Sequence, residues 1–130
     1  MNMNNKSLAI KQQAFEKALI QLEKVLTQPP SEYIRDAAIQ RFEFTYELAW
    51  KTLQAYLATI DITVLSPKET LKIACQQGLL TDANAWTELH MKRNLTSHTY
   101  DEKLAESVYL YLQKSGLQLF MDLKNTLKTR

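Results

Sequence analysis

The fold is decided by residues 32–60, EYIRDAAIQRFEFTYELAWKTLQAYLATI. This stretch contains no glycine and no proline, and its apolar residues recur at the three- and four-residue spacing of a helix. Ser31, directly before it, suits the N-cap position, and Glu32 in the first turn suits the positive end of the helix dipole. The sequence therefore predicts one long helix over residues 32–60.

This helix carries apolar residues on two nearly opposite sides, at about 100° of rotation per residue. One stripe consists of Phe42, Tyr46, Ala49, Trp50, Leu53, Leu57 and Ile60. The second stripe consists of Ala37, Phe44, Leu48 and Ala55. A helix with two apolar faces must be covered twice, so it lies in the middle of the domain or one face meets a second subunit. Both can hold along different lengths, and Phe44 and Leu48 are the candidates for a dimer interface.

Further segments on either side of this helix also have helical patterns. Residues 7–26 repeat apolar positions at helical spacing, and Pro29 and Pro30 end that helix. The sequence Ser-Pro-Lys-Glu at 66–69 is a capping box with proline at the first helical position, so a third helix is expected to start there. Gly78 is suited to end it as a C-cap glycine.

A fourth helix is expected to start near residues 81–82 and to lead directly into Arg93. Its apolar positions are Trp86, Leu89 and Met91. A fifth is expected over residues 101–126, with Gly116 inside it at a cost of about 1 kcal/mol. Residues 62–65 are β-prone, but so short a stretch between helices is expected to be a loop. The pattern predicts an all-α domain of about five helices.

Composition narrows the class of protein. A chain of 130 residues favours a single domain over residues 1–130, and 45% apolar residues are typical of a globular protein. The net charge of +2 is too small to indicate nucleic-acid binding by itself. Cys75 is the only cysteine, so it forms no internal disulfide, and its apolar surroundings predict a buried structural thiol.

The expected location is the cytoplasm. The first six residues are polar and lack the apolar stretch of a signal peptide. No run approaches the roughly 18 apolar residues that a membrane span needs.

The residues with chemical potential concentrate in one segment, RNLTSHTY at 93–100. The Arg93 guanidinium offers five N–H donors to a phosphate, and the His98 imidazole can exchange a proton near neutral pH. Tyr100 adds a phenol, and no acidic residue lies inside the segment. His90 and His98 are the only histidines and do not have the spacing of metal ligands on a helix, so no metal site is predicted.

Helix geometry constrains this segment. On an unbroken helix Arg93 and Tyr100 share a face, whereas His98 points about 140° away from Arg93. Three arrangements could still bring the two groups to one anion. The helix may end near Ser97 so that His98 swings round, the loop may approach another helix, or two protomers may face each other across a two-fold axis. The poor helix formers before the capping-type Asp101 favour a break.

Two stretches, RFEFTYELAWKTL at 41–53 and RNLTSHTYD at 93–101, resemble signatures of the nucleotidyltransferase substrate-binding protein family. The resemblance extends from about residue 15 to residue 123. This family belongs to the HEPN superfamily, and the resemblance implies a four-helix up-and-down bundle with an additional short helix. Arg93, His98 and Tyr100 match the form R-x-x-x-x-H-x-Y of the superfamily motif.

The resemblance implies a partner subunit of a separate minimal nucleotidyltransferase, usually encoded nearby, and often a homodimer in a toxin–antitoxin pair. ATP and magnesium are then expected in the partner enzyme and no cofactor in this chain. Tyr100 is the candidate acceptor of an adenylyl group. Arg93, Asn94 and Ser97 are the candidates for binding its phosphate.

The alternative implied by the same resemblance is a metal-independent ribonuclease toxin. His98 would then exchange a proton with the ribose 2′-hydroxyl, and Arg93 would stabilise the charge that grows on the phosphorus. RNA would be a further partner. A third possibility, a helical interaction module in which the motif only packs, ranks last because two separate motifs match.

Overall fold

The computed structural model describes residues 3–130, and every regular element in that range is a helix. Residues 1–2, which begin the polar N-terminal segment, lie outside the described residues. The helices are α1 (Met3–Leu26), α2 (Glu32–Thr59), α3 (Pro67–Gln76), α4 (Ala83–Leu95), α5 (Glu102–Tyr111) and α6 (Leu117–Lys128). A short 3₁₀ turn, η1 (Thr96–His98), follows α4, and a π-helical turn, η2 (Leu112–Gly116), joins α5 to α6. The predicted all-α fold is confirmed.

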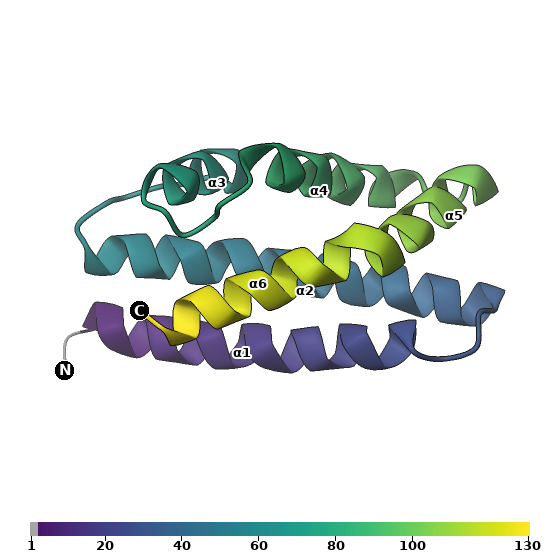
Figure 1. Ribbon diagram of the computed structural model, residues 1–130, viewed down its shortest axis with the longest axis horizontal. Coiled ribbons are helices and arrows are strands. Elements are labelled where there is room, and N and C mark those ends of the chain that lie inside the picture. The colour runs from purple at the N-terminus through teal and green to yellow at the C-terminus, as the bar shows by residue number, and fades with distance from the viewer. Residues whose placement is uncertain (1–2) are drawn as a thin grey trace.

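The helices form an elongated bundle (Figure 1). α1 and α2 run antiparallel along its whole length, α3 and α4 lie over α2, and α5 with α6 returns diagonally across them. Phe120 of α6 lies at the centre and is fully buried. Its ring centroid is 6.3 Å from that of Phe15 in α1, 6.1 Å from Phe42 in α2 and 6.0 Å from Trp86 in α4. Aromatic packing around Phe120 therefore joins α1, α2, α4 and α6.

The two stripes predicted on α2 have different surroundings. The first stripe is buried from Phe42 to Leu57, but Ile60 is 43% exposed because α2 ends at Thr59 and the chain turns at Asp61 with φ of 64°. On the second stripe Ala55 is buried, Ala37 and Leu48 are half-buried, and Phe44 is 56% exposed. The helix thus lies in the middle of the domain, which is one of the two interpretations of the pattern, and Phe44 is the main uncovered residue of the second stripe.

The predicted caps of α3 and α4 are confirmed. The Ser66 hydroxyl accepts a hydrogen bond from the Glu69 N–H at 3.2 Å, and the Asp82 carboxylate accepts one from Ala85 at 3.0 Å. Gly78 follows α3 with φ of 76°, a backbone conformation that glycine adopts without strain. Trp86 and Leu89 are buried as predicted, but Met91 is 60% exposed, so its assignment to the core was wrong.

The predicted fifth helix is one rod interrupted by η2. Gly116 lies in helical backbone at the end of this π turn, where a Cβ atom would approach the Leu112 Cδ2 and Tyr111 Cε2 atoms to 3.0 Å. Glycine is therefore present because the wider turn brings these side chains against its backbone. The extra residue of a π turn also shifts the apolar face of α6 relative to that of α5.

Candidate functional site

The segment from Arg93 to Tyr100 begins in the last turn of α4 and continues through η1. α4 ends at Leu95, which confirms the predicted break near Ser97. The Asp101 carboxylate caps α5 by accepting from the Lys103 and Leu104 N–H groups at 2.9 and 3.3 Å. The segment is therefore a short link between two capped helices.

An ion pair holds the start of α5 against α2. Arg35 of α2 is buried, and its Nη1 lies 2.8 Å from the Glu102 Oε2. The hydrogen bond from Arg35 holds the pKa of the Glu102 carboxyl below its usual range. The C-terminal end of the segment is thereby fixed beside the N-terminal part of α2.

The Arg93 side chain faces α2. Its Nη1 donates to the Thr96 hydroxyl at 2.9 Å and lies 3.7 Å from the Glu43 Oε2. Thr96 is buried, and its hydroxyl oxygen lies 2.7 Å from the Arg93 carbonyl and 3.2 Å from the same Glu43 oxygen. Its single proton can serve only one of these two acceptors at a time. The Arg93 Nε is buried and has no hydrogen-bond partner among the described residues.

Glu43 is the residue that sequence reasoning missed. The segment itself contains no acid, but the fold places a carboxylate from α2 beside its guanidinium. Glu43 lies in the RFEFTYELAWKTL stretch, between the two apolar stripes of α2. A charged residue between two covered faces of a helix needs a partner of opposite charge. This position of Glu43 was the sequence signal that could have identified it.

His98 and Tyr100 lie on the exposed side of the same segment. Their rings are arranged edge to face with centroids 6.0 Å apart, and the His98 Nδ1 is 3.4 Å from the Tyr100 hydroxyl. Tyr100 is 84% exposed. The His98 imidazole is therefore close enough to the Tyr100 hydroxyl to exchange a proton with it. Because the phenol is exposed, its oxygen is also accessible from solvent.

The remaining polar residues of the segment divide in the same way. Asn94 and Ser97 are exposed, and the Ser97 hydroxyl donates to the Asn94 carbonyl at 3.0 Å. Lys92, directly before the segment, lies against α5. Its Nζ donates to the Ser107 hydroxyl at 3.3 Å and sits 5.6 Å from the centre of the Tyr111 ring.

Within one chain the contacts direct Arg93 and His98 to different surroundings. Arg93 contacts Thr96 and Glu43, whereas His98 contacts Tyr100, and no hydrogen bond joins the two motif residues in the described part of the chain. The helix break alone therefore does not bring them to one anion. The arrangement across a two-fold axis stays a prediction.

His90 lies one turn before Arg93 and forms a half-buried pair with Tyr46 of α2. The Tyr46 hydroxyl is 2.5 Å from the His90 Nδ1. Burial raises the pKa of Tyr46 to about 12, and burial together with the charges of Lys68 and Arg93 lowers the pKa of His90. Tyr46 therefore keeps its proton, and the direction of its hydrogen bond with His90 depends on which ring nitrogen of the imidazole carries the proton.

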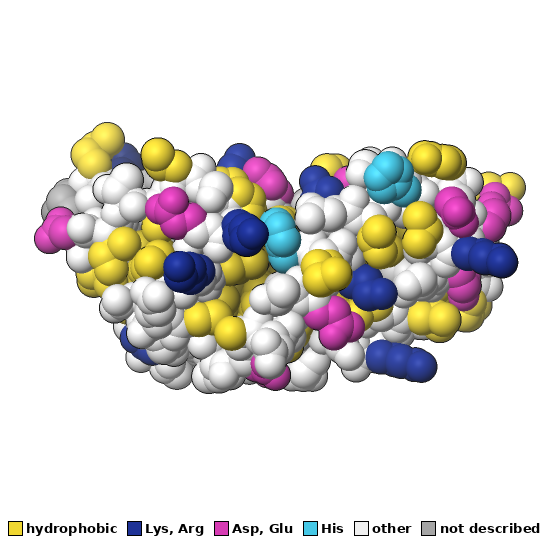
Figure 2. Space-filling view, turned by 90° about the horizontal axis from the view of Figure 1, so that it is seen from above, with side chains coloured by type: hydrophobic (Ala, Val, Ile, Leu, Met, Phe, Trp, Pro, Cys, Tyr) yellow, Lys and Arg dark blue, Asp and Glu magenta, His cyan; other side chains and the backbone are white. Residues whose placement is uncertain are grey.

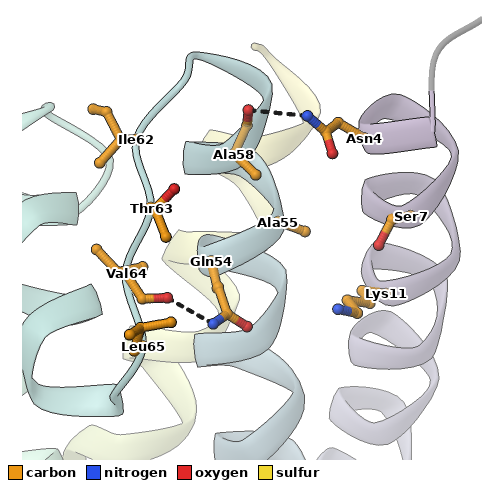
Figure 3. Close-up of a pocket in the computed structure, with 10 residues that line it drawn as sticks. All are labelled: Asn4, Ser7, Lys11, Gln54, Ala55, Ala58, Ile62, Thr63, Val64 and Leu65. Carbon is orange, nitrogen blue, oxygen red and sulfur yellow. Dashed lines mark hydrogen bonds between the residues drawn. The ribbon is translucent and has the colours of Figure 1, made fainter.

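Hollows in the surface of the described residues lie away from the segment. A cavity of about 570 Å³ separates α3 from α4, and Cys75, predicted to be buried, is only half-buried because it lines this cavity. Burial still raises the pKa of its thiol. A smaller hollow of about 260 Å³ lies at the opposite end of the bundle from Tyr100 (Figure 3). There the side-chain amides of Asn4 and Gln54 donate hydrogen bonds to the carbonyls of Ala58 and Val64, so each amide already has a partner within the protein.

No group of three or more histidine, cysteine, aspartate or glutamate side chains within residues 3–130 could hold a metal ion. None of the helices over the same range is both long and apolar enough to cross a bilayer.

The comparison with protein families is decisive for the whole chain. A family model described as nucleotidyltransferase substrate binding protein like matches residues 11–129, which include both quoted motifs. The chain belongs to this nucleotidyltransferase substrate-binding family. The resemblance inferred from the sequence is thereby confirmed.

Two solved structures share the fold of this family member. A protein from Thermus thermophilus is 39% identical, with a TM-score of 0.81 over 88% of this chain and 98% of that one. HI0074 of Haemophilus influenzae is 31% identical, with a TM-score of 0.64 over 93% and 96% of the two chains. HI0074 is described as a substrate binding domain of a nucleotidyltransferase.

A curated relative of this family member is a probable ribonuclease HepT from Haemophilus influenzae. It is 42% identical over 77 residues, which are 55% of this chain and 53% of the relative. The match spans about half the length of that relative.

Proposed function

We propose that this protein is the partner subunit of a nucleotidyltransferase carried on a separate chain, and that Tyr100 accepts an adenylyl group from it. Family membership and the likeness to HI0074 support the partnership. The observation that carries the acceptor role is the exposed Tyr100 phenol, 84% accessible, with the His98 Nδ1 3.4 Å from its oxygen.

The transfer follows from these two groups. The Tyr100 oxygen forms a bond to the α-phosphorus of ATP, and the bond from that phosphorus to the β-phosphate bridging oxygen breaks. Pyrophosphate leaves, and the phenol proton passes to His98. ATP and magnesium belong to the transferase. Asn94 and Ser97, both exposed beside His98, are the nearest polar groups for the phosphate in this chain.

Intact-mass spectrometry after incubation with the neighbouring transferase, ATP and magnesium tests this proposal. Wild type is expected to gain about 329 Da for each adenylyl group transferred, and Tyr100→Phe is expected to gain nothing. Tyr33→Phe is the matched control, because Tyr33 is 85% exposed on α2 and should leave labelling unchanged. Equal labelling of wild type and Tyr100→Phe would remove Tyr100 as the acceptor.

A metal-independent ribonuclease is the second candidate, favoured by the probable ribonuclease HepT among the relatives. The ribose 2′-oxygen would bond to the adjacent phosphorus as the 5′-oxygen leaves, giving a cyclic phosphate, with His98 exchanging the proton. Arg93 would have to leave Glu43 or come from a second protomer. Wild type is then expected to cleave RNA in EDTA, and His98→Ala is not. Activity that EDTA abolishes would exclude this mechanism.

A homodimer is part of the second candidate, because one chain keeps Arg93 and His98 apart. Phe44 is the exposed residue of the second apolar stripe of α2, and Leu48 is a half-buried residue of the same stripe. Light scattering should show a monomer for Phe44→Glu and a dimer for wild type. Ile10→Glu is the matched control, because Ile10 is 60% exposed on α1. A dimer that survives Phe44→Glu would place the interface elsewhere.

A further inference from the structure

The cavity between α3 and α4 has the size and lining of a small-molecule site. Its volume of about 570 Å³ falls inside the range of roughly 300–1,000 Å³ that is usual for ligand pockets. Its apolar lining includes Leu71, Cys75 and Trp86. Figure 2 shows the surface hollowed near the middle of this face, with a histidine and lysine or arginine side chains beside the hollow. No residue of the 93–100 segment lines it.

His90 presents a ring nitrogen to this cavity. The ring lines the cavity, and its Nδ1 is taken by the Tyr46 hydroxyl at 2.5 Å. In the tautomer whose Nδ1 accepts from the Tyr46 hydroxyl, the neutral ring carries its proton on Nε2. Nε2 is then the ring nitrogen that remains for a ligand, and the hydrogen bond to α2 fixes the orientation of the ring.

Positive charge gathers at the same cavity. Lys68 and Lys72 line it from α3, and Glu69 is the only acidic residue among the lining residues. Burial first, and then the positive charges of Lys68 and Arg93, lower the pKa of the His90 imidazole. Among the described residues no ion pair engages either lysine, so both ammonium groups are available to an anion.

We propose that the cleft between α3 and α4 binds a nucleoside monophosphate. Its ring lies in the apolar part of the cavity, which Leu71, Cys75 and Trp86 line, and its phosphate meets Lys68, Lys72 and the His90 Nε2–H. A cavity that combines an apolar lining with ammonium groups suits a molecule that joins an apolar ring to one anionic group. This site is separate from the Tyr100 acceptor and does not depend on it.

Tryptophan fluorescence tests the proposal, because Trp50 and Trp86 are the only tryptophans. In Trp50→Phe the signal comes from Trp86 alone, and adenosine 5′-monophosphate is expected to change it saturably. Adenosine and inorganic phosphate should each bind at least tenfold more weakly, since each lacks half of the recognised molecule. Calorimetry on wild-type protein should give the same affinity ranking, which guards against a folding defect of Trp50→Phe.

Charge variants complete the test. Lys68→Gln with Lys72→Gln is expected to weaken the nucleotide at least tenfold, whereas Lys17→Gln, an exposed lysine on α1, should leave affinity unchanged. Tyr100→Phe should also bind normally, so a failed acceptor role and a failed cleft can be told apart. Absence of saturable binding, equal binding of adenosine, or unchanged affinity in the double lysine variant would each overturn the proposal.

Discussion

The two halves of the 93–100 segment differ in what holds them. Arg93 and Thr96, the held half, face α2 and share contacts with the Glu43 carboxylate. His98 and Tyr100, the exposed half, contact each other and face solvent. The held half fixes the backbone of η1, whereas the exposed half presents an imidazole and a phenol to solvent. Buried contacts and exposed side chains are thus divided within eight residues.

The two histidines repeat this difference. His90 is half-buried, bonded to Tyr46, and has a lowered pKa. His98 is exposed, and its ring contacts Tyr100 alone among the interactions of the described residues. A histidine that is neutral and fixed serves as a hydrogen-bonding group, whereas an exposed one next to a phenol can exchange protons with a substrate. The residue type alone does not distinguish these roles.

The largest expected effect comes from a core residue of α4, the helix that carries Arg93. Leu89 of α4 is fully buried, so Leu89→Ala should lower the free energy of unfolding by about 2–5 kcal/mol. Met91→Ala, two residues along the same helix but 60% exposed, should change it by less than about 0.5 kcal/mol. Urea denaturation of both variants measures this difference. Similar losses would mean that α4 does not pack through Leu89.

A smaller effect is expected inside the segment itself. Thr96→Val removes a buried hydroxyl that bonds Arg93 and Glu43, and should destabilise by about 1–3 kcal/mol. Ser97→Ala is the matched control, since the exposed Ser97 hydroxyl bonds only a local carbonyl, and a change within about 0.5 kcal/mol is expected. Equal effects, measured by chemical denaturation, would erase the distinction between the halves.

The smallest effect is a pH dependence from His90. Its pKa is lower in the folded protein than in the unfolded chain, so its protonation favours unfolding. Stability should therefore be full above the ordinary histidine pKa of about 6.5 and should fall as the pH drops toward the folded value. Thermal denaturation of wild type and His90→Gln between neutral and mildly acidic pH checks this. An identical acid loss in His90→Gln would assign it to other groups.

The sequence predicted the helices well because capping residues and apolar periodicity act locally. Ser66, Asp82 and Asp101 each cap the helix that they were expected to start. Met91 was wrongly assigned to the core because the neighbouring helices cover only part of the circumference of α4. Which side of α4 is covered depends on where α3 and α5 lie. The π turn also escaped prediction, and at its end Gly116 lies where the Tyr111 and Leu112 side chains approach the backbone.

The candidate site was predicted in its composition but not in its grouping. The poor helix formers before the capping-type Asp101 correctly indicated a break near Ser97, and His98 lies beside Tyr100 just after the end of α4. The pairing of Arg93 with Glu43 joins residues fifty positions apart, and no local pattern encodes such a contact. The division of the motif into held and exposed halves therefore needed the tertiary structure.

Peptide mapping after reaction with the transferase tests the central claim most directly. Trypsin cleaves after Arg93 and Lys103, so residues 94–103 form a single peptide that contains Tyr100 as its only tyrosine. Mass spectrometry is expected to find the adenylyl group on this peptide, at Tyr100. An adenylyl group on Tyr33 or on any other peptide, or none on a fully active pair, would contradict the account.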